Sequence, residues 1–337
     1  MSLRVIKPGL LTSIQDLGRK GFQQHGVIIS GAMDAYSLRI ANMLVGNKEG
    51  EAALEITLMG PTLKIEKNCL IAITGGNLSP TIDSQTVPMW RPVYVKKGTI
   101  LRFEGCKSGC RSYLSVAGGY AISTVMNSKS TYLRGEIGGY KGRALKVDDV
   151  VDFNVTSTIL NNREFKEAFT APKWFVNDKE FMPSRMPAIR FIDGSQSDYF
   201  TDSSKVSFTE NLFKVSNQSD RMGYRISGPL LELNEKRELL SEAVTNGSVQ
   251  VPPDGNPIIL LADSQTTGGY PKIAQVITAD LPMIAQIKPG ESIQFSRVTL
   301  KEAEQLFLQK EQQLKELKVS ILLALKNSRL YSYFIKK

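Results

Sequence analysis

Short apolar runs alternate with glycine, proline and asparagine clusters along the first half of the chain. The runs AALEITL, LIAIT, PVYVKK and YLSVAGG are rich in β-branched and aromatic residues, and turn signals separate them. The pattern resumes in the second half, in AIRFIDG, YRISG, PIILLAD and SIQFSRV. Runs of this length and spacing predict the strands of barrels or sandwiches. The chain is therefore predicted to be mainly β, with a few helices.

Two stretches break this pattern with helical spacing. From Asp34 to Val45 apolar residues recur every three or four positions, Asp34 can cap the start, and Gly46 stops the helix. A second amphipathic helix is predicted from Leu300 to Leu325, and its apolar last turns need cover from the protein body or a partner. Its apolar face is predicted to contain Ala303, Leu306, Phe307, Leu314, Leu317 and Ile321.

A change in composition near the middle of the chain indicates where one domain ends and the next begins. Residues 154–187 mix polar, aromatic and charged residues without a period, and prolines interrupt them, which is typical of a linker zone. We therefore predict an N-terminal β-barrel-like domain at 1–153, a linker zone at 154–187, a second β-barrel domain at 188–299, and a helix and tail at 300–337.

The overall charge and the rare residue types narrow the class of protein. The formal net charge is +9, but lysines and arginines are scattered, so we expect no nucleic-acid partner. No apolar run reaches the ~18 residues of a membrane helix, and the N-terminus lacks a signal-peptide core. We expect a cytoplasmic protein with no membrane contact. Three cysteines without zinc-like spacing indicate no metal site. The single histidine, His25, rules out mechanisms that need two imidazoles, and we expect it in a turn.

Glycine pairs end four of the apolar runs, at residues 75–76, 118–119, 138–139 and 268–269. A glycine pair after a strand permits positive φ and exposes backbone N–H groups. No G-x-x-x-x-G-K-[ST] loop, no G-x-G-x-x-G between strand and helix and no Met-Lys-Met biotin site is present. ATP or biotin chemistry would therefore need groups from another chain.

The run DSQTTGGYPK, which follows the apolar stretch PIILLA, concentrates small polar groups at one strand end. It supplies a carboxylate at Asp263, amide and hydroxyl groups, and the backbone donors of a glycine pair. Such donors can hold a carboxylate, an amide or a carbonyl oxygen that gains charge. Upstream, Arg221 or Arg225 is suited to bind a substrate carboxylate through two hydrogen bonds. These features predict a small-molecule site.

Five long segments stand in order over nearly the whole chain: KPGLLTSIQDLGRKGFQQHGVIISGAMD, EAALEITLMGP, SKSTYLRGEIGGYKGRAL, SDRMGYRISGP and VQVPPDGNPIILLADSQTTGGYPKIAQVITADLP. They resemble the successive motifs of the allophanate hydrolase subunit 2 family, also called biotin-dependent carboxyltransferase-like proteins, whose members include 5-oxoprolinase C subunits and Kip antagonists. The tail after Lys318 does not resemble the family, and no function is transferred to it.

The resemblance implies two cyclophilin-like β-barrel domains and a place in a heteromer. The expected complex is an ATP-dependent 5-oxoprolinase, which hydrolyses 5-oxo-L-proline to L-glutamate with two partner subunits, one of the Kip-inhibitor-like type and one of the lactam-utilisation type. A carboxyltransferase of a urea carboxylase system is the alternative, with biotin carried elsewhere. A second alternative is a non-catalytic antagonist that binds a Kip-inhibitor-like regulator of a sensor kinase.

Both reactions act on a planar amide or urea group, which suggests roles for the motif residues. Asp263 would accept an N–H or shuttle a proton, Gln265 and Thr267 would hold the carbonyl oxygen, and Arg221 would hold a carboxylate. The other expected substrate contacts are Tyr224, Gln250, Asp254, Thr266, Gly268, Gly269 and Tyr270.

The N-terminal motifs add candidates for a cleft: Gln15, Asp16, Arg19, Ser30, Asp34 and Arg134. Structural roles compete with functional ones here. Asp16 and Arg19 are equally suited to an ion pair within the first loop, and Asp34 to a helix cap. Glu55 lies in an apolar strand, so it needs a partner if buried, and we expect Arg134 or Arg143 to provide it.

Overall fold

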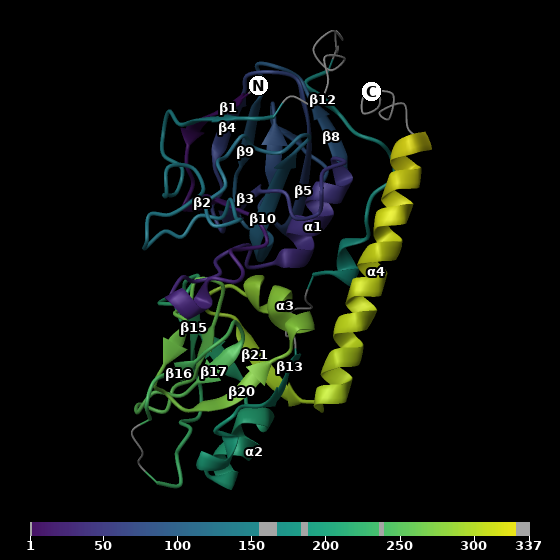
Figure 1. The fold of residues 1–337 in the computed structure, drawn as a ribbon. Helices are drawn as coiled ribbons and strands as arrows, with labels where there is room; N and C mark the ends of the chain where they lie inside the picture. Colours follow the sequence, from purple (N-terminus) through teal and green to yellow (C-terminus); the bar gives the residue numbers. More distant parts are fainter. Residues whose placement is uncertain (1, 155–166, 183–187, 236–238, 328–337) are drawn as a thin grey trace. The chain divides into compact units, whose positions relative to one another are not determined.

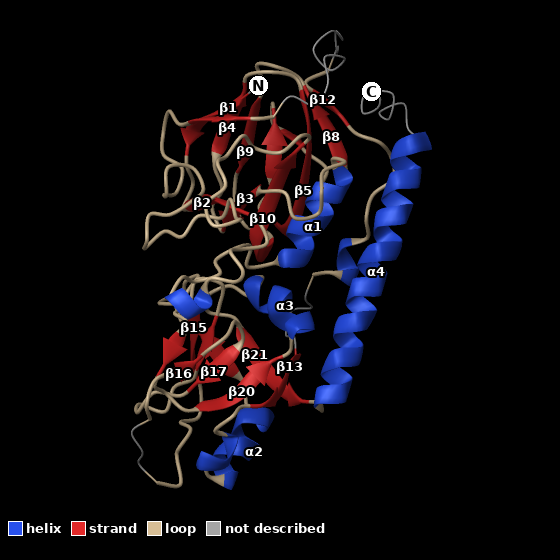
Figure 2. Cartoon of the chain, viewed as in Figure 1, coloured by secondary structure: helices blue, strands red, loops and turns tan. Residues whose placement is uncertain are grey.

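The computed structural model describes residues 2–154, 167–182, 188–235 and 239–327, and strands predominate in it (Figures 1 and 2). Contacts divide the chain into two units. The first contains Met1–Gly18, Asp34–Met182 and Gln313–Lys337, and the second contains Arg19–Met33 and Pro183–Gln312. The units are therefore not continuous in sequence, because a short N-terminal segment belongs with the second unit.

The first unit contains two six-stranded sheets among its described residues, and every strand pair in them is antiparallel. One sheet has the order β11 (Val150–Asp152), β1 (Ser2–Lys7), β4 (Thr62–Ile65), β9 (Ile100–Phe103), β6 (Pro80–Ile82) and β7 (Gln85–Thr86). The other has the order β12 (Phe169–Thr170), β8 (Pro92–Val95), β5 (Cys69–Asn77), β10 (Ser108–Val116), β3 (Ala53–Thr57) and β2 (Leu11–Gln15). Strand β12 comes from the predicted linker zone and pairs with β8.

Buried aliphatic side chains from strands of both sheets form the core of the first unit. Leu3 and Val5 of β1, Ile56 of β3 and Ile71 and Ile73 of β5 belong to this cluster and are completely buried. These positions alternate along their strands, which is the period of two that places every second side chain on one face. The apolar runs seen in the sequence therefore supply the core.

Helix α1 (Ala35–Leu44) packs against β5 and β10 of the first unit (Figure 1). Asp34 caps it, because its side chain accepts a hydrogen bond from the Ser37 backbone N–H at 2.9 Å. Ile40 and Leu44, one turn apart, are completely buried. The prediction of this helix and of its cap is confirmed.

The second unit contains a closed seven-stranded barrel. Around it the strands follow the order β13 (Ala188–Asp193), β20 (Lys272–Val276), β17 (Ser248–Gln250), β18 (Ile258–Leu260), β15 (Gly223–Ser227), β14 (Phe213–Val215) and β21 (Ser292–Arg297). A short two-stranded ribbon pairs β16 (Glu242–Ala243) with β19 (Thr267–Gly268). Helices α2 (Asp202–Glu210) and α3 (Leu281–Ala285) also belong to this unit.

Aromatic rings fill part of the barrel unit's core. Phe208 of α2 stacks on Phe295 of β21 with ring centroids 4.1 Å apart, and Phe191 and Phe213 meet these rings at steep angles. Edge-to-face and offset contacts of this kind suit the charge distribution of aromatic rings. Met33 is buried in the same cluster, which ties the N-terminal segment to the barrel.

Helix α4 (Leu300–Asn327) confirms the predicted C-terminal helix. Its buried residues are Leu314, Ile321 and Leu325, which cluster with apolar residues of the first unit. Phe307, predicted for the same face, is instead 38% exposed. Within the described residues no helix is long and apolar enough to cross a membrane.

Candidate functional site

A buried ion pair joins the two charged residues that the sequence places at the site. Arg221 Nε and Nη2 donate to Asp263 Oδ2 and Oδ1 at 2.8 and 2.9 Å, and both side chains are about 5% exposed or less. Arg221 Nη2 also donates to the Gly31 carbonyl oxygen at 2.7 Å. The expected roles treat Arg221 and Asp263 as separate contacts to the substrate. In the structure they bind each other, and together they hold the backbone of the ISGAMD motif.

The residue before this anchor is strained. Ser30 has a φ of 54°, in the left-handed region that disfavours residues with a side chain. It is 4% exposed, and its hydroxyl has no hydrogen-bond partner among the described residues. Strain and an unpaired buried hydroxyl are both costly and often mark functional segments. The Arg221–Asp263 pair fixes the backbone next to this residue.

The run after Asp263 continues into the β16–β19 ribbon. Gly268 lies tightly against Gln250, since a Cβ atom added to Gly268 would be 2.6 Å from Gln250 Nε2. Gln250 is 2% exposed and donates to the Tyr270 carbonyl oxygen at 3.2 Å. Gln250 therefore supports the ribbon through contact with its backbone.

The expectation of positive φ fails at this glycine pair. Gly75, Gly118–Gly119 and Gly138–Gly139 have positive φ, but neither Gly268 nor Gly269 does. Gly268 pairs with Glu242 of β16, which requires extended backbone and explains the difference at Gly268. Gly268 is needed for close approach to Gln250 and not for a left-handed turn.

A polar network fixes the ribbon to the barrel. Lys272 Nζ lies 2.9 Å from Glu242 Oε2, and Gln196 Nε2 donates to the same carboxylate oxygen at 2.8 Å. The hydrogen bond from Lys272, followed by that from Gln196, lowers the pKa of the Glu242 carboxyl below its usual value. The β16 strand of the ribbon is thus held to the barrel by two side chains.

The remaining predicted contacts separate into exposed and buried groups. Gln265, Thr267 and Tyr270 are exposed, and Thr266 is half-buried. Asp254 is also exposed, and its carboxylate accepts from the Asn256 backbone N–H. Tyr224 is a core residue whose hydroxyl donates to the Ile287 carbonyl oxygen at 3.2 Å. Its placement corrects the expectation of a substrate contact, because its ring is packed in the barrel core.

In the first unit the IQD motif meets the SKST motif. Asp16 accepts hydrogen bonds from the Ser128 hydroxyl at 2.7 Å, the Lys129 backbone N–H at 2.6 Å and the Ser130 hydroxyl at 2.5 Å. Gln15 Nε2 donates to the Thr131 carbonyl oxygen at 3.1 Å. Gln15 and Asp16 are buried, and their hydrogen bonds fix the backbone at residues 128–131. Ser128 and Ser130 were not predicted as site residues. They lie in SKSTYLRGEIGGYKGRAL, one of the segments that resemble the family, and this could have indicated them.

Arg19 and Arg134 have different environments. Arg19 is completely buried in the second unit, and its backbone N–H donates to the Ile29 carbonyl oxygen at 2.7 Å. Arg134 belongs to the first unit and is exposed. Its place in the expected cleft stays a prediction.

Glu55 is buried as expected, but its predicted partners are wrong. It accepts a hydrogen bond from the Tyr113 hydroxyl at 2.7 Å, and Arg111 Nε lies 3.9 Å away. Arg143 instead pairs with Asp149 at 2.7 and 2.8 Å. Burial, with the adjacent Glu55 charge, raises the pKa of Tyr113 well above its usual value. The hydroxyl therefore stays protonated and donates to Glu55.

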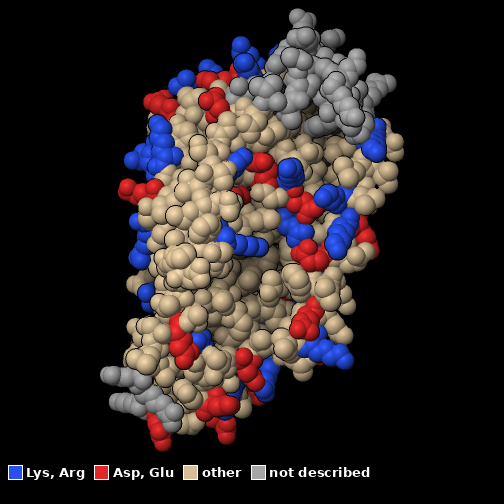
Figure 3. Space-filling model, viewed as in Figure 1, with Lys and Arg blue, Asp and Glu red and all other residues tan. Residues whose placement is uncertain are grey.

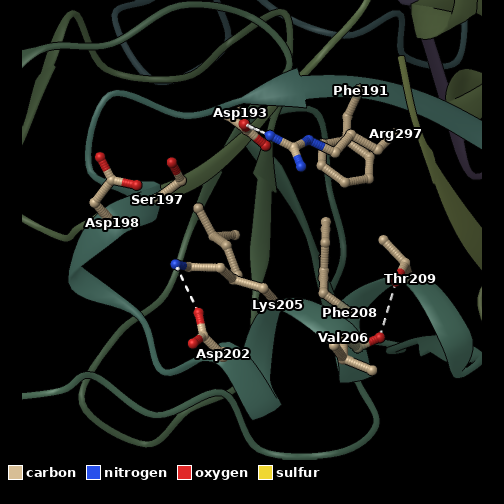
Figure 4. A pocket seen from close by; sticks show the side chains of 11 residues that line it. Phe191, Asp193, Ser197, Asp198, Asp202, Lys205, Val206, Phe208, Thr209 and Arg297 are labelled. Atoms are coloured by element: carbon tan, nitrogen blue, oxygen red, sulfur yellow. Dashed lines mark hydrogen bonds and ion pairs between the residues drawn. The ribbon is translucent and has the colours of Figure 1, made fainter. Parts of the chain in front are cut away.

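A surface pocket of about 400 Å³ lies in the second unit, beside α2 (Figure 4). The view shows Asp193 pointing toward Arg297, and Lys205 pointing toward Asp202, with which it pairs at 3.3 Å. Asp202 is 99% exposed, so this pair is weak. The described residues that line the pocket include none of the Asp263–Lys272 run, so the pocket is separate from the predicted site.

Taken alone, neither the charges on the visible face nor the metal-binding groups of the described residues indicate another site. Figure 3 shows lysines and arginines interspersed with acidic residues over the visible face. Within the described ranges, no group of three or more His, Cys, Asp or Glu side chains is placed to hold a metal ion. His25 lies in a short 3-10 turn, Gln23–His25, as expected.

Comparison with known proteins agrees with the motif pattern. Residues 25–297 match the family described as carboxyltransferase domain, subdomain A and B, and the chain belongs to this family. It is 41% identical to the C subunit of 5-oxoprolinase from Haemophilus influenzae over 294 residues, which cover 87% of this chain and 90% of the relative. It is 40% identical to the corresponding 5-oxoprolinase C subunit of Escherichia coli, over 89% of this chain and 93% of the relative.

The fold of this chain is also similar to that of a solved structure. The crystal structure of the Kluyveromyces lactis urea carboxylase superposes with a TM-score of 0.84 and 32% identity. The match covers 94% of this chain but only 29% of that protein. The fold of this chain therefore corresponds to one part of a much longer enzyme.

Proposed function

We propose that this chain is the C subunit of an ATP-dependent 5-oxoprolinase, which hydrolyses 5-oxo-L-proline to L-glutamate. One observation carries the proposal: two 5-oxoprolinase C subunits are 41% and 40% identical to it, and the matches extend over nine-tenths of their lengths. A match over the whole length of a relative supports a shared role more strongly than a match to one part of a longer protein.

The geometry suggests how the chain would contribute to this reaction. The substrate is a lactam, a planar amide whose carbonyl oxygen gains negative charge as the ring opens. The exposed Gln265 and Thr267 side chains are suited to donate to that oxygen from the ribbon. Asp263 and Arg221 would act as positioning residues, because they are buried and bonded to each other.

The rest of the reaction would need the other members of the complex. ATP would be used by the complex, because this sequence contains no phosphate-binding loop of its own. We propose two partner proteins, one Kip-inhibitor-like and the other of the lactam-utilisation type. The complex would act in the cytoplasm, and this chain alone would be inactive.

The carboxyltransferase of a urea carboxylase is the second candidate. It is favoured by the superposition on the K. lactis urea carboxylase. A urea nitrogen and carbonyl resemble the lactam amide, so the same donors would suit both. Biotin would be carried by another protein, because this sequence contains no Met-Lys-Met attachment site.

Substrate-dependent ATP consumption separates the two candidates. The purified chain is mixed with the Kip-inhibitor-like and lactam-utilisation-type partners, and ADP release is followed with 5-oxo-L-proline, with urea, and without substrate. We expect ADP release only with 5-oxo-L-proline, and none when this chain is left out. ATP consumption unchanged by 5-oxo-L-proline would overturn the proposal. Carboxylation of urea with a biotin carboxylase present would favour the second candidate.

A further inference from the structure

The surface pocket beside α2 has the size and the mixed lining of a small-molecule site. Its volume of about 400 Å³ lies within the range of about 300–1,000 Å³ that is usual for ligand sites. The residues that line it all belong to the second unit. Because they include none of the Asp263–Lys272 run, a ligand bound here would leave the predicted site unoccupied.

Apolar side chains form one part of the pocket lining. Phe191, Phe208 and Ile273 belong to the barrel core and are at most 4% exposed, and Val206 of α2 is 52% exposed. Figure 4 shows Phe191, Phe208 and Val206 toward the same side of the pocket. A ligand that covers this apolar surface removes it from water, and an aromatic ligand would also contact the phenylalanine rings. This part of the pocket is suited to an aromatic or aliphatic group.

The charged part of the lining contains more acidic than basic side chains. Three carboxylates, those of Asp193, Asp198 and Asp202, share the pocket with Lys205 and Arg297. Arg297 pairs with Asp193, and Lys205 pairs with Asp202 at 3.3 Å. Within the part of the chain that the structure describes, Asp198 has no cationic partner. The lining therefore contains one negative charge that no basic side chain balances.

This local excess of negative charge favours a cationic ligand. It does not follow from composition, because the whole chain has a formal net charge of +9. Figure 4 shows Ser197 and Asp198 together at one end of the pocket, toward which Lys205 extends. An ammonium group there could donate to the Asp198 carboxylate and to the Ser197 hydroxyl, and hydrogen bonds between charged groups are strong ones.

An anionic ligand would be bound less well in the same pocket. It would be repelled by Asp198, and it could reach Arg297 or Lys205 only by competing with Asp193 or Asp202. The lining therefore selects a positive charge over a negative one.

We propose that this pocket binds a small organic cation, a primary amine joined to an aromatic or branched aliphatic group. Asp198 holds the ammonium group, and the apolar group lies against Phe208 and Val206. The combination of an apolar wall with an unbalanced carboxylate carries this proposal, which does not depend on the proposed function. Neither 5-oxo-L-proline, which is an anion, nor urea, which is neutral, has this chemistry.

An NMR titration of the full chain with three probes tests the proposal. The probes are 2-phenylethylamine, 3-phenylpropionate, which has a similar size and the opposite charge, and methylammonium, which has the charge without the apolar group. We expect saturable binding of 2-phenylethylamine and much weaker binding of the other two. No saturable binding of 2-phenylethylamine would overturn the proposal. Equal binding of 3-phenylpropionate or of methylammonium would also overturn it.

Two substitutions in the lining should change the affinity for 2-phenylethylamine in opposite directions. Asp198→Asn should raise the dissociation constant by at least about threefold, because it removes the balancing charge. Lys205→Gln should lower it by about twofold, because it removes a like charge. The matched control is Glu210→Gln, at the exposed last residue of α2 and outside the lining, which should leave the affinity unchanged.

Equal melting temperatures would show that these substitutions preserve the fold, since all three positions lie at the surface. Equal effects of Asp198→Asn and Glu210→Gln would contradict the assignment of the ammonium group to Asp198. Weaker binding by Lys205→Gln would also contradict the proposal, because a cation should gain from the loss of this lysine.

Discussion

The Arg221–Asp263 pair shows at the scale of single residues how the fold changes the meaning of a motif. Each residue taken alone is suited to contact a substrate. In the structure each carboxylate oxygen of Asp263 accepts one bond from Arg221. A buried charge without a partner is costly, so the two residues depend on each other.

Removing one partner should therefore destabilise the fold strongly. We expect Asp263→Asn to lower the free energy of unfolding by about 3–5 kcal/mol, because it leaves the Arg221 charge buried without compensation. The control is Asp193→Asn, which disrupts the exposed pair with Arg297 and should cost at most about 1 kcal/mol. Urea unfolding curves measure both. Equal small losses would show that the buried pair is not structurally important.

Asp149 provides a prediction about pH. The Arg143 guanidinium, through its hydrogen bond, holds the pKa of this carboxyl below its usual value, and the Lys146 backbone N–H also contributes. A lowered pKa in the folded state means that the pair stabilises the fold above the unfolded-state pKa. That stabilisation is lost as the pH falls through the folded-state pKa.

Asp149→Asn should accordingly be less stable than the wild type at neutral pH by about 1–2 kcal/mol. The difference should shrink as the pH falls from about 4, the ordinary pKa of an unfolded aspartate, through the lower folded-state pKa, where the folded carboxyl takes up its proton. Asp148→Asn, at the exposed neighbouring position, is the control and should show no such trend. Thermal melts across this pH range provide the measurement. A deficit that stays constant with pH would contradict the explanation.

At the scale of elements, the loop from Ser128 to Arg143 depends on glycine packing. Gly139 has a φ of +55°, and a Cβ atom added there would lie 1.9 Å from Thr131 Oγ1. Thr131 is itself held by Gln15 and by the Ile14 carbonyl oxygen. The threonine therefore has little freedom to move away.

Gly139→Ala should destabilise the protein by about 2–4 kcal/mol, because it combines left-handed strain with a steric clash. Gly98→Ala tests strain alone, since Gly98 has a φ of +89° with nothing within 4 Å of an added Cβ. It should cost only about 1 kcal/mol. Denaturant unfolding of both variants gives the comparison. Equal losses would show that contact with Thr131 does not matter.

Helices α1 and α4 are elements that the local sequence pattern predicts well. Helix α1 and its Asp34 cap follow from spacing within a dozen residues, and so does α4. The exposure of Phe307 could not be predicted from the sequence. Periodicity predicts which side of a helix is apolar, but not how far along the helix that side is covered by the rest of the protein.

At the scale of the whole molecule, periodicity also predicts the mainly β class and the strand-rich halves. It does not predict partners far apart in sequence. Asp16 meets Ser130, and Arg221 meets both Gly31 and Asp263. Glu55 meets Tyr113 and Arg111 instead of Arg134 or Arg143. Such contacts depend on strand order and register, which no local pattern contains.

The boundaries of the two units also depend on contacts between residues far apart in sequence, so local pattern does not predict them. Residues 19–33 precede the first unit's helix in sequence but pack with the second unit. The burial of Met33 in the barrel core reveals this, and a single apolar residue in a glycine-rich segment gives no such signal in the sequence.

The central claim is that this chain is a necessary component of a lactam hydrolase. The most direct measurement is L-glutamate formed from 5-oxo-L-proline and ATP by the reconstituted mixture of this chain with its Kip-inhibitor-like and lactam-utilisation-type partners. We expect L-glutamate only when all three proteins and ATP are present. We also expect its formation to fall when Gln265 and Thr267 are both replaced by alanine, with the fold intact. Equal L-glutamate formation with and without this chain would contradict the account.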